Sequence, residues 1–331
     1  MTVGLTRRAF VTSSSIVAGA VAAPALLRAQ PTVIRWGESL PATHPQLQMA
    51  ERVAKDVKEK TSGRIDVQVF PNGQLGTNSQ LIESVSSGAL QLTTDGAGQL
   101  AAFLPQISVI EAPYLWRDAA HLAKAASSPI FAKMNADLSA KRGMVLLNVT
   151  YYGKRQLTSG SKPVKSPSDM VGFKLRVPAV DVFRAMAEAW GARATPIAIS
   201  ELYLALSQGA VDGEENPLPT IQSNKFYEVQ KFLVLTEHII TPRIIIANQA
   251  FLKGLPAADH DLLRAAFDAG AKWQDSELLT QEAALVGTLK SQGMTVVDVN
   301  VAEWKKPVLE SVPKKFEEKW GAGTFDTLAA M

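Results

Sequence analysis

The chain has 331 residues, of which 47% are hydrophobic, and its 34 Lys and Arg residues exceed its 31 Asp and Glu residues by three. It contains no cysteine, which excludes disulfides, thiolate metal sites and cysteine nucleophiles. The excess charge belongs to Arg7, Arg8 and Arg28, so the rest of the chain is close to neutral and gives no reason to expect nucleic-acid binding. A chain of this length and composition can bury a large core, most simply as two lobes.

The first 29 residues have the pattern of an export signal. Paired arginines in the stretch LTRRAF precede a modestly apolar segment at 16–27, and Leu27-Arg28-Ala29 offers a cleavage site. Paired arginines in this position are typical of the twin-arginine export route. We therefore predict a twin-arginine signal peptide over residues 1–29 and a soluble product in a bacterial periplasm. The apolar segment is shorter than the roughly 20 residues that a membrane-spanning helix needs. An amphipathic first helix of the fold is disfavoured, because no acidic residue occurs before Glu38.

The following segments alternate between strand and helix patterns. Residues 64–70 alternate apolar and polar side chains, as a half-buried strand does, while 47–60 repeats apolar residues at helical spacing. The patterns predict strands at 32–37, 64–70 and about 90–94, helices at 47–60 and about 78–88, and a turn at 71–76. Strands that alternate with helices favour an α/β lobe with a largely parallel sheet.

The same alternation continues beyond residue 140 and ends in one long helix. We predict strands at 144–152 and 173–177, helices at 181–190 and 201–208, and two strand-like segments within 226–248. Residues 257–292 read as a helix that only Gly270 interrupts, which exceeds the ordinary length of globular helices. We expect this helix to run across both lobes. The predicted lobes are 30–152 with 242–280 (lobe I) and 153–241 with 281–331 (lobe II), joined by strands.

Two arginines follow or end predicted strands. Arg176 lies at the end of the apolar strand 173–177, directly before Pro178 stops the ladder, and Arg155 follows the strand 144–152 at a predicted turn. Ligands of open α/β sheets gather at the carboxyl ends of strands, and a guanidinium there can bind a carboxylate through two hydrogen bonds. The alternative for each is a surface arginine paired with an acid. Two such arginines favour a shared anion-binding crevice.

The segment GAVDGEENPLP, at 209–219, combines acidic and amide side chains in a predicted loop. Its glycine comes too early for a calcium loop of the EF-hand kind, and no carboxylate follows until Glu228. Glu214 and Glu215 are adjacent, so in an extended chain they point in opposite directions and do not face each other as a catalytic pair. No zinc-protease, nucleophile-elbow, P-loop or dinucleotide motif occurs. The sequence therefore predicts no catalytic residue, no metal site and no cofactor.

Four motifs in this order resemble one known family. The motifs are YYGKRQLTS (151–159), GFKLRVP (172–178), ISELYLALSQGAVDGEENP (199–217) and KFYEVQKFL (225–233). In an exported α/β chain they are similar to the substrate-binding proteins of TRAP transporters (tripartite ATP-independent periplasmic transporters), the DctP-type family. The resemblance implies two α/β lobes, hinged by crossing strands and a long helix, that close on a small organic acid. It also implies a monomer that delivers this acid to TRAP membrane permease subunits.

The resemblance implies site residues as well. Arg176 corresponds to the main carboxylate clamp, Arg155 to a second anion contact, and Asn216 to the amide that hydrogen-bonds the substrate. The first lobe of such proteins adds polar contacts from three regions, which Glu38, Asn78 and Asp95 occupy here. Ile199 stands where many members have an aromatic residue, so the ligand itself is not implied.

Two other functions are compatible with the residues alone. A secreted hydrolase or lyase acting on an anionic sugar would use Glu38 or the pair Glu214 and Glu215 as acid and base, and it would consume its ligand. A periplasmic receptor that presents its ligand to a sensor kinase would share the fold of a transport receptor.

Overall fold

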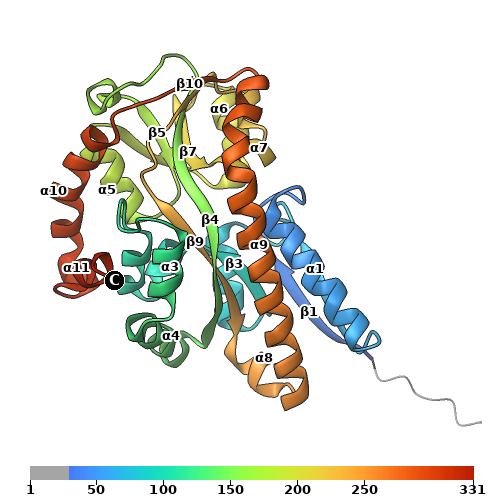
Figure 1. Ribbon diagram of the computed structural model, residues 1–331. Coiled ribbons are helices and arrows are strands. Elements are labelled where there is room, and N and C mark those ends of the chain that lie inside the picture. The colour runs from blue at the N-terminus through green and yellow to red at the C-terminus, as the bar shows by residue number, and fades with distance from the viewer. Residues whose placement is uncertain (1–29) are drawn as a thin grey trace, which may run out of the picture. The chain divides into compact units, whose positions relative to one another are not determined.

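The computed structural model describes residues 30–331, and its first elements alternate strand and helix (Figure 1). They are β1 (Thr32–Gly37), α1 (Pro45–Lys60), β2 (Ile65–Phe70), α2 (Asn78–Ser87) and β3 (Leu92–Asp95). β1 pairs in parallel with β2 on one side and with β3 on the other. This arrangement confirms the α/β fold expected from the alternating pattern.

Helical segments lead from β3 to the longest strand. They are η1 (Ala97–Ala102), η2 (Pro105–Glu111), α3 (Ala119–Ala126) and α4 (Pro129–Arg142), where η denotes a 3₁₀ helix. β4 (Met144–Ser159) then belongs to two sheets. Its first part pairs antiparallel with β9 (Ile240–Asn248), and its last residues pair with β7 (Gly213–Pro217) and β8 (Phe232–Val234). β4 thus carries the chain from one sheet into the other.

The first sheet has the strand order β2-β1-β3-β9-β4, and the second continues from β4 as β7-β5-β6. β5 (Lys174–Val177) and β6 (Arg193–Pro196) are parallel, and β10 (Thr295–Val297) adds to β8. The predicted strand at 144–152 ended too early, because Gly153 and the charged residues after it have the composition of a turn. In the folded protein their charges have partners, and the strand continues to Ser159.

The composition of the acidic segment at 209–219 suggested a loop, but the structure contains a strand there. Its residues 213–217 form β7, which pairs with β4 on one side and β5 on the other, and all five residues are buried. Gly, Glu, Asn and Pro have low strand propensity, so local preference pointed away from a strand. Pairing on both sides and partners for the carboxylates override that preference.

The remaining helices cover the sheets. They are η3 (Pro167–Met170), α5 (Asp181–Ala189), α6 (Ile199–Ser207), α7 (Leu218–Ser223), η4 (Phe226–Glu228), α8 (Gln249–Gly254), α9 (Ala257–Ser291), α10 (Val301–Trp320) and α11 (Thr324–Ala329). α9 has 35 residues, as the sequence predicted, and Figure 1 shows it running beside β4 from α8 to β10. It packs on α1 near its start and on α7 further along. Accordingly Phe267 belongs to the core under the first sheet, whereas Leu285 and Leu289 belong to a core with α6 and α7.

The C-terminal helices contact elements that precede and follow the crossing strand. Trp304 of α10 accepts a hydrogen bond from Trp190 through its carbonyl, and Trp320 donates one to Ser108.

Residues 31–331 form one compact unit, and the predicted boundaries of lobes I and II stay a prediction. The predicted signal peptide at 1–29 lies outside the described residues. Within residues 30–331 no helix combines the length and the apolarity needed to cross a membrane.

Candidate functional site

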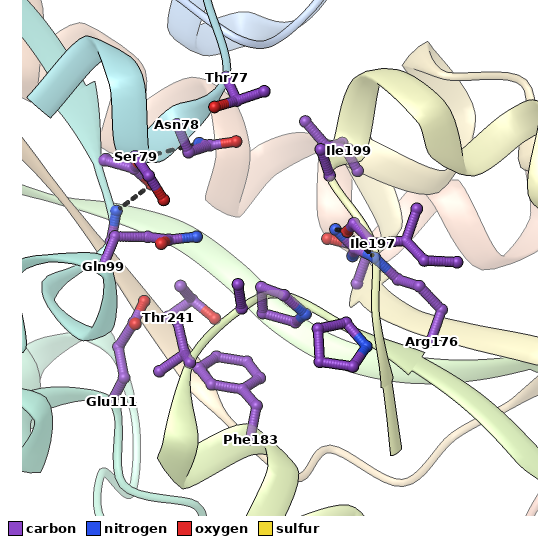
Figure 2. A pocket seen from close by; sticks show the side chains of 18 of the residues that line it. Thr77, Asn78, Ser79, Gln99, Glu111, Arg176, Phe183, Ile197, Ile199 and Thr241 are labelled. Atoms are coloured by element: carbon purple, nitrogen blue, oxygen red, sulfur yellow. Dashed lines mark hydrogen bonds between the residues drawn. The ribbon is translucent and has the colours of Figure 1, made fainter. Parts of the chain in front are cut away.

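A pocket of about 220 Å³ lies between elements of the two sheets (Figure 2). The strands β4 and β9, which pair with each other, supply Tyr152, Arg155, Thr241 and Arg243 to its wall. Of the six residues that the resemblance singled out, five line this pocket: Arg176, Arg155, Asn216, Asn78 and Asp95. Glu38 does not. The described residues hold no cluster of three or more His, Asp or Glu side chains arranged for a metal ion.

Arg176 is a buried guanidinium that makes no ion pair with any described residue. It is 3% exposed, and its Nε and Nη2 donate to the carbonyl oxygen of Ile197 at 2.8 and 2.6 Å. Burial lowers its pKa to about 10, Glu215 and Glu214 act in the opposite direction, and the charge of Arg155 adds to the lowering. A buried charge without a counterion is costly, so a bound anion would be strongly stabilised beside it. Figure 2 shows Arg176 with Ile197 and Ile199 at one side of the pocket.

Arg155, in contrast, already has a carboxylate partner. Its Nε donates to Glu215 Oε2, its Nη2 donates to Glu215 Oε1 at 2.9 Å, and the same nitrogen donates to Asn216 Oδ1 at 3.1 Å. Burial alone would raise the pKa of Glu215, but Arg155 and His238 outweigh it and leave that pKa lowered. The His238 ring contacts Glu215 through Nε2 at 2.9 Å. Only Nη1 of Arg155 is without a hydrogen bond among the described residues, so this arginine has less to offer a ligand than Arg176.

Asn216 is held in place from both ends of its amide. Its Oδ1 accepts from Arg155, and its Nδ2 donates to Glu214 Oε2 at 2.5 Å. Glu214 also accepts from Thr158 Oγ1 at 3.0 Å. Burial raises the pKa of Glu214 to about 7, although the hydrogen bond from Asn216 opposes that shift. The second hydrogen of Nδ2 is the group through which Asn216 can reach a ligand.

The opposite wall contains a third arginine that sequence reasoning missed. Arg243 Nη1 pairs with Asp95 Oδ1, and its guanidinium lies 4.1 Å from the centre of the Tyr152 ring. Asp95 Oδ2 accepts from Asn78 Nδ2 at 2.7 Å, so Asp95 positions both neighbours. The sequence did contain a signal for Arg243. It is a charged residue next to Pro242 in an otherwise apolar strand, and Arg176 likewise lies near a proline in an apolar strand.

Glu38 does not line the pocket, although it is close enough to Arg243 and Asp95 for their charges to affect it. It is fully buried, and its Oε2 accepts from Gln46 Nε2 at 2.5 Å, beneath α1. Burial raises its pKa to about 8. Sequence reasoning placed it correctly after the first strand but could not tell which way its side chain points. Glu111 and Phe183 are among the pocket residues that had no sequence signal.

Comparisons with known proteins agree on one family. Residues 36–319 match DctP, the "Bacterial extracellular solute-binding protein, family 7". The chain belongs to this family. A solute-binding protein of Verminephrobacter eiseniae is 35% identical to it over 83% of this chain and 82% of its own. The sialic acid-binding periplasmic protein SiaP of Vibrio cholerae is 31% identical over 91% of this chain and 93% of its own.

Solved structures of TRAP periplasmic solute-binding proteins have the same fold. A TRAP periplasmic solute-binding protein of Polaromonas sp. JS666 bound to D-erythronate is 32% identical, with a TM-score of 0.86 over 91% of this chain and 99% of that one. One of Actinobacillus succinogenes with bound L-galactonate is 29% identical, with a TM-score of 0.86 over 90% of this chain and 98% of that one. The predicted family and its α/β binding-protein fold are thus confirmed. As a family 7 member the chain is a solute-binding protein and not an enzyme. This excludes the alternative function of a secreted hydrolase or lyase.

Proposed function

We propose that this protein is a periplasmic receptor that binds a sugar-type organic acid and delivers it to the membrane permease of a TRAP transporter. Relatives support the ligand class, because their solved structures contain D-erythronate, L-galactonate or β-D-galacturonate. In this proposal the acid lies in the pocket between the two sheets, with its carboxylate on Arg176. Closure of the two predicted lobes around it excludes water and produces the shape that the permease recognises.

The unpaired charge of Arg176 is the observation that supports this proposal. Arg155 and Arg243 each have a carboxylate within the protein, but Arg176 has only a carbonyl oxygen. Its side chain is oriented by Ile197, which leaves Nη1 without a hydrogen bond among the described residues. A carboxylate ligand would complete the missing ion pair. Asn216 Nδ2 and Arg155 Nη1 are then the neighbouring donors for the same ligand.

The carboxylate clamp is tested by substituting Arg176. A thermal-shift screen against organic acids identifies ligands, and calorimetry then compares the parent with Arg176→Lys. We expect binding to weaken by roughly tenfold to a hundredfold, because hydrogen bonds to charged groups contribute about 1.5–3 kcal/mol each and lysine lacks the planar fork. Arg193→Lys is the matched control, since Arg193 lies exposed on β6 beside β5. Unchanged affinity in Arg176→Lys would exclude the clamp.

Asn78 and Asp95 have a different proposed role. Both line the pocket, and both are engaged with Arg243 or with each other. We assign them to positioning Arg243 and to hydrogen bonds with ligand hydroxyl groups. Glu38 keeps no proposed contact with the ligand, because it does not line the pocket.

The leader supports export through the twin-arginine route. Arg7 and Arg8 precede the apolar segment, and we propose that residues 1–29 are removed to give a soluble, monomeric periplasmic protein. Changing both arginines to lysine should leave the unprocessed protein in the cytoplasm, which fractionation and immunoblotting would detect. Export of the double variant at the parental level would favour the general secretory route.

A further inference from the structure

Glu111 ends η2 with its side chain in the wall of the pocket, yet the proposed carboxylate clamp does not use it. The residue is 3% exposed. Its Oε2 accepts from the backbone N–H of Gly98 at 2.7 Å, and its Oε1 has no hydrogen bond among the described residues. Figure 2 shows Glu111 across the pocket from Arg176. One carboxylate oxygen therefore remains available on the side away from the clamp.

Two glycines make room for this carboxylate. A Cβ atom added to Gly96 would lie 2.2 Å from Glu111 Oε1, and one added to Gly98 would lie 2.5 Å from Oε2. With Glu111 in this position, neither residue could carry a Cβ atom. The backbone of η1 thus approaches the carboxylate closely from one side and supplies a donor to it.

The charges around the pocket match in pairs, with one exception on each side. Arg155 pairs with Glu215, and Arg243 pairs with Asp95. Arg176 remains as a cation without a paired carboxylate, and Glu111 remains as an acid without an ion pair within 4 Å among the described residues. The charged groups that face Glu111 are Arg243, Arg155 and Asp95. A ligand in this pocket meets an unpaired cation at one end and an acid at the other.

We propose that Glu111 is a specificity-determining residue that accepts hydrogen bonds from the hydroxyl-bearing end of the ligand and disfavours a second carboxylate there. The class selected is polyhydroxy monocarboxylates over the corresponding dicarboxylates. This inference rests on the proposed function, because it needs the first carboxylate on Arg176. In a pocket of low dielectric a second carboxylate beside Glu111 would add like-charge repulsion that water cannot screen. A hydroxyl group at the same place donates a charge-assisted hydrogen bond instead.

Matched pairs of acids test the inference. Calorimetry compares monocarboxylates with dicarboxylates of equal length, such as galactonate with galactarate and erythronate with tartrate, in the parent and in Glu111→Gln. Glutamine keeps an acceptor for Gly98 but removes the charge. We expect the parent to prefer the monocarboxylate at least tenfold, and the variant to lose about tenfold of that preference by binding the dicarboxylate more tightly. Glu83→Gln, on the exposed face of α2, is the control and should keep the parental ratio.

A second measurement needs no variant. Burial raises the pKa of Glu111 to about 7, so the group is largely neutral at pH 6 and ionised at pH 8.5, while both carboxylates of the ligands stay ionised. The parental preference for the monocarboxylate should therefore increase with pH.

The outcomes separate this inference from the proposed function. A parent that prefers the dicarboxylates, or a preference that neither Glu111→Gln nor pH changes, overturns the role of Glu111 but leaves the receptor for acids intact. Binding only of acids without hydroxyl groups overturns it as well. Failure of the parent to bind any acid in the library overturns the proposed function, and the inference falls with it.

Discussion

Two buried arginines of the pocket carry the same charge in opposite situations. Arg155 is neutralised by Glu215, which also contacts His238, and the side chains of Glu215 and His238 are fully buried. Arg176 has no such partner, which is what a binding residue needs. At the scale of the residue, Arg155 therefore has a structural role, whereas Arg176 is available to bind a ligand. The strand β7 contributes to both, because Glu215 is structural and its neighbour Asn216 retains a free donor.

The structural role of Glu215 predicts a large loss of stability in Glu215→Gln. Removing one partner from a buried ion pair costs about 3–5 kcal/mol, because the other charge is left uncompensated. Urea unfolding at pH 7 measures this difference. The pKa of Glu215 is lowered, so its contribution is fully present above the ordinary value of 4.5 and is lost as pH falls through the lowered value.

The cost of Glu215→Gln should accordingly shrink in acid. Glu201→Gln, exposed on α6 at the same end of the molecule, is the control and should stay within about 0.5 kcal/mol of the parent. A Glu215→Gln protein as stable as the parent at pH 7 would show that Arg155 does not depend on this carboxylate.

Sequence motifs reached some pocket residues and not others for a physical reason. Arg176, Arg155 and Asn216 lie in contiguous motifs, so a resemblance carries them over one by one. Glu111 reaches the pocket only because η2 folds toward it from another part of the chain, whereas Phe183 lies on α5, directly after the strand that carries Arg176, and its side chain turns into the pocket. No local pattern encodes that direction. Glu38 is the opposite case: its position after a strand predicted a pocket residue, but that position does not determine where its side chain points.

At the scale of the element, the crossing strand β4 is irregular where it passes between the sheets. Its register with β9 shifts between Tyr151 and Gly153. α9 binds the backbone there: Asp275 accepts from Tyr151 N and Glu282 accepts from Lys154 N, both at 2.7 Å. The sequence predicted the long helix correctly but not this function. The helix compensates for ladder hydrogen bonds that the irregular strand lacks.

Gly153 should be the least replaceable residue of this crossing. Its φ of +119° suits only glycine, and an added Cβ would lie 2.8 Å from Pro217 Cβ. We expect Gly153→Ala to lower the free energy of unfolding by at least about 2 kcal/mol, since backbone strain and overpacking add. Chemical denaturation measures it.

Gly209→Ala is the matched control for backbone strain alone. Gly209 also has positive φ, at +68°, but no atom lies within 4 Å of its added Cβ. Its substitution should cost only about 1 kcal/mol. Equal costs for the two variants would mean that the contact with Pro217 relaxes freely.

At the scale of the whole molecule, the two sheets are joined at a polar centre. Apolar periodicity predicted most of the elements that build the sheets, because burial of one face leaves a regular signal. It could not predict β7 or the second part of β4, whose strand residues are charged or polar and are buried with partners from other elements. Those two segments unite the sheets and line the pocket. The part that the pattern missed is therefore the part nearest to the site.

This buried polar centre gives the ligand-free protein a defined dependence on pH. Burial raises the pKa of Glu38 to about 8 and the pKa values of Glu214 and Glu111 to about 7. A carboxyl group with a raised pKa binds its proton more tightly in the folded state, so its contribution to stability falls as pH rises from 4.5 to the raised value. His44 and His238 have lowered pKa values, and their opposite effect is largely present at pH 6.5 and complete about one pH unit higher.

Between pH 6.5 and 8.5 the carboxyl groups should determine the trend, because the remaining effect of the two histidines is smaller, and the free energy of unfolding should decrease. Glu38 has the highest of these pKa values and accounts for a decrease of about 2 kcal/mol over this interval. Glu38→Gln cannot ionise, so it should lose that part of the decrease and be more stable than the parent at pH 8.5. Urea unfolding of both proteins at the two pH values measures the difference, with the exposed Glu83→Gln as a control that follows the parent. A parent whose stability does not change over this interval would show that Glu38 is already ionised in the folded state, with a counterion that compensates it.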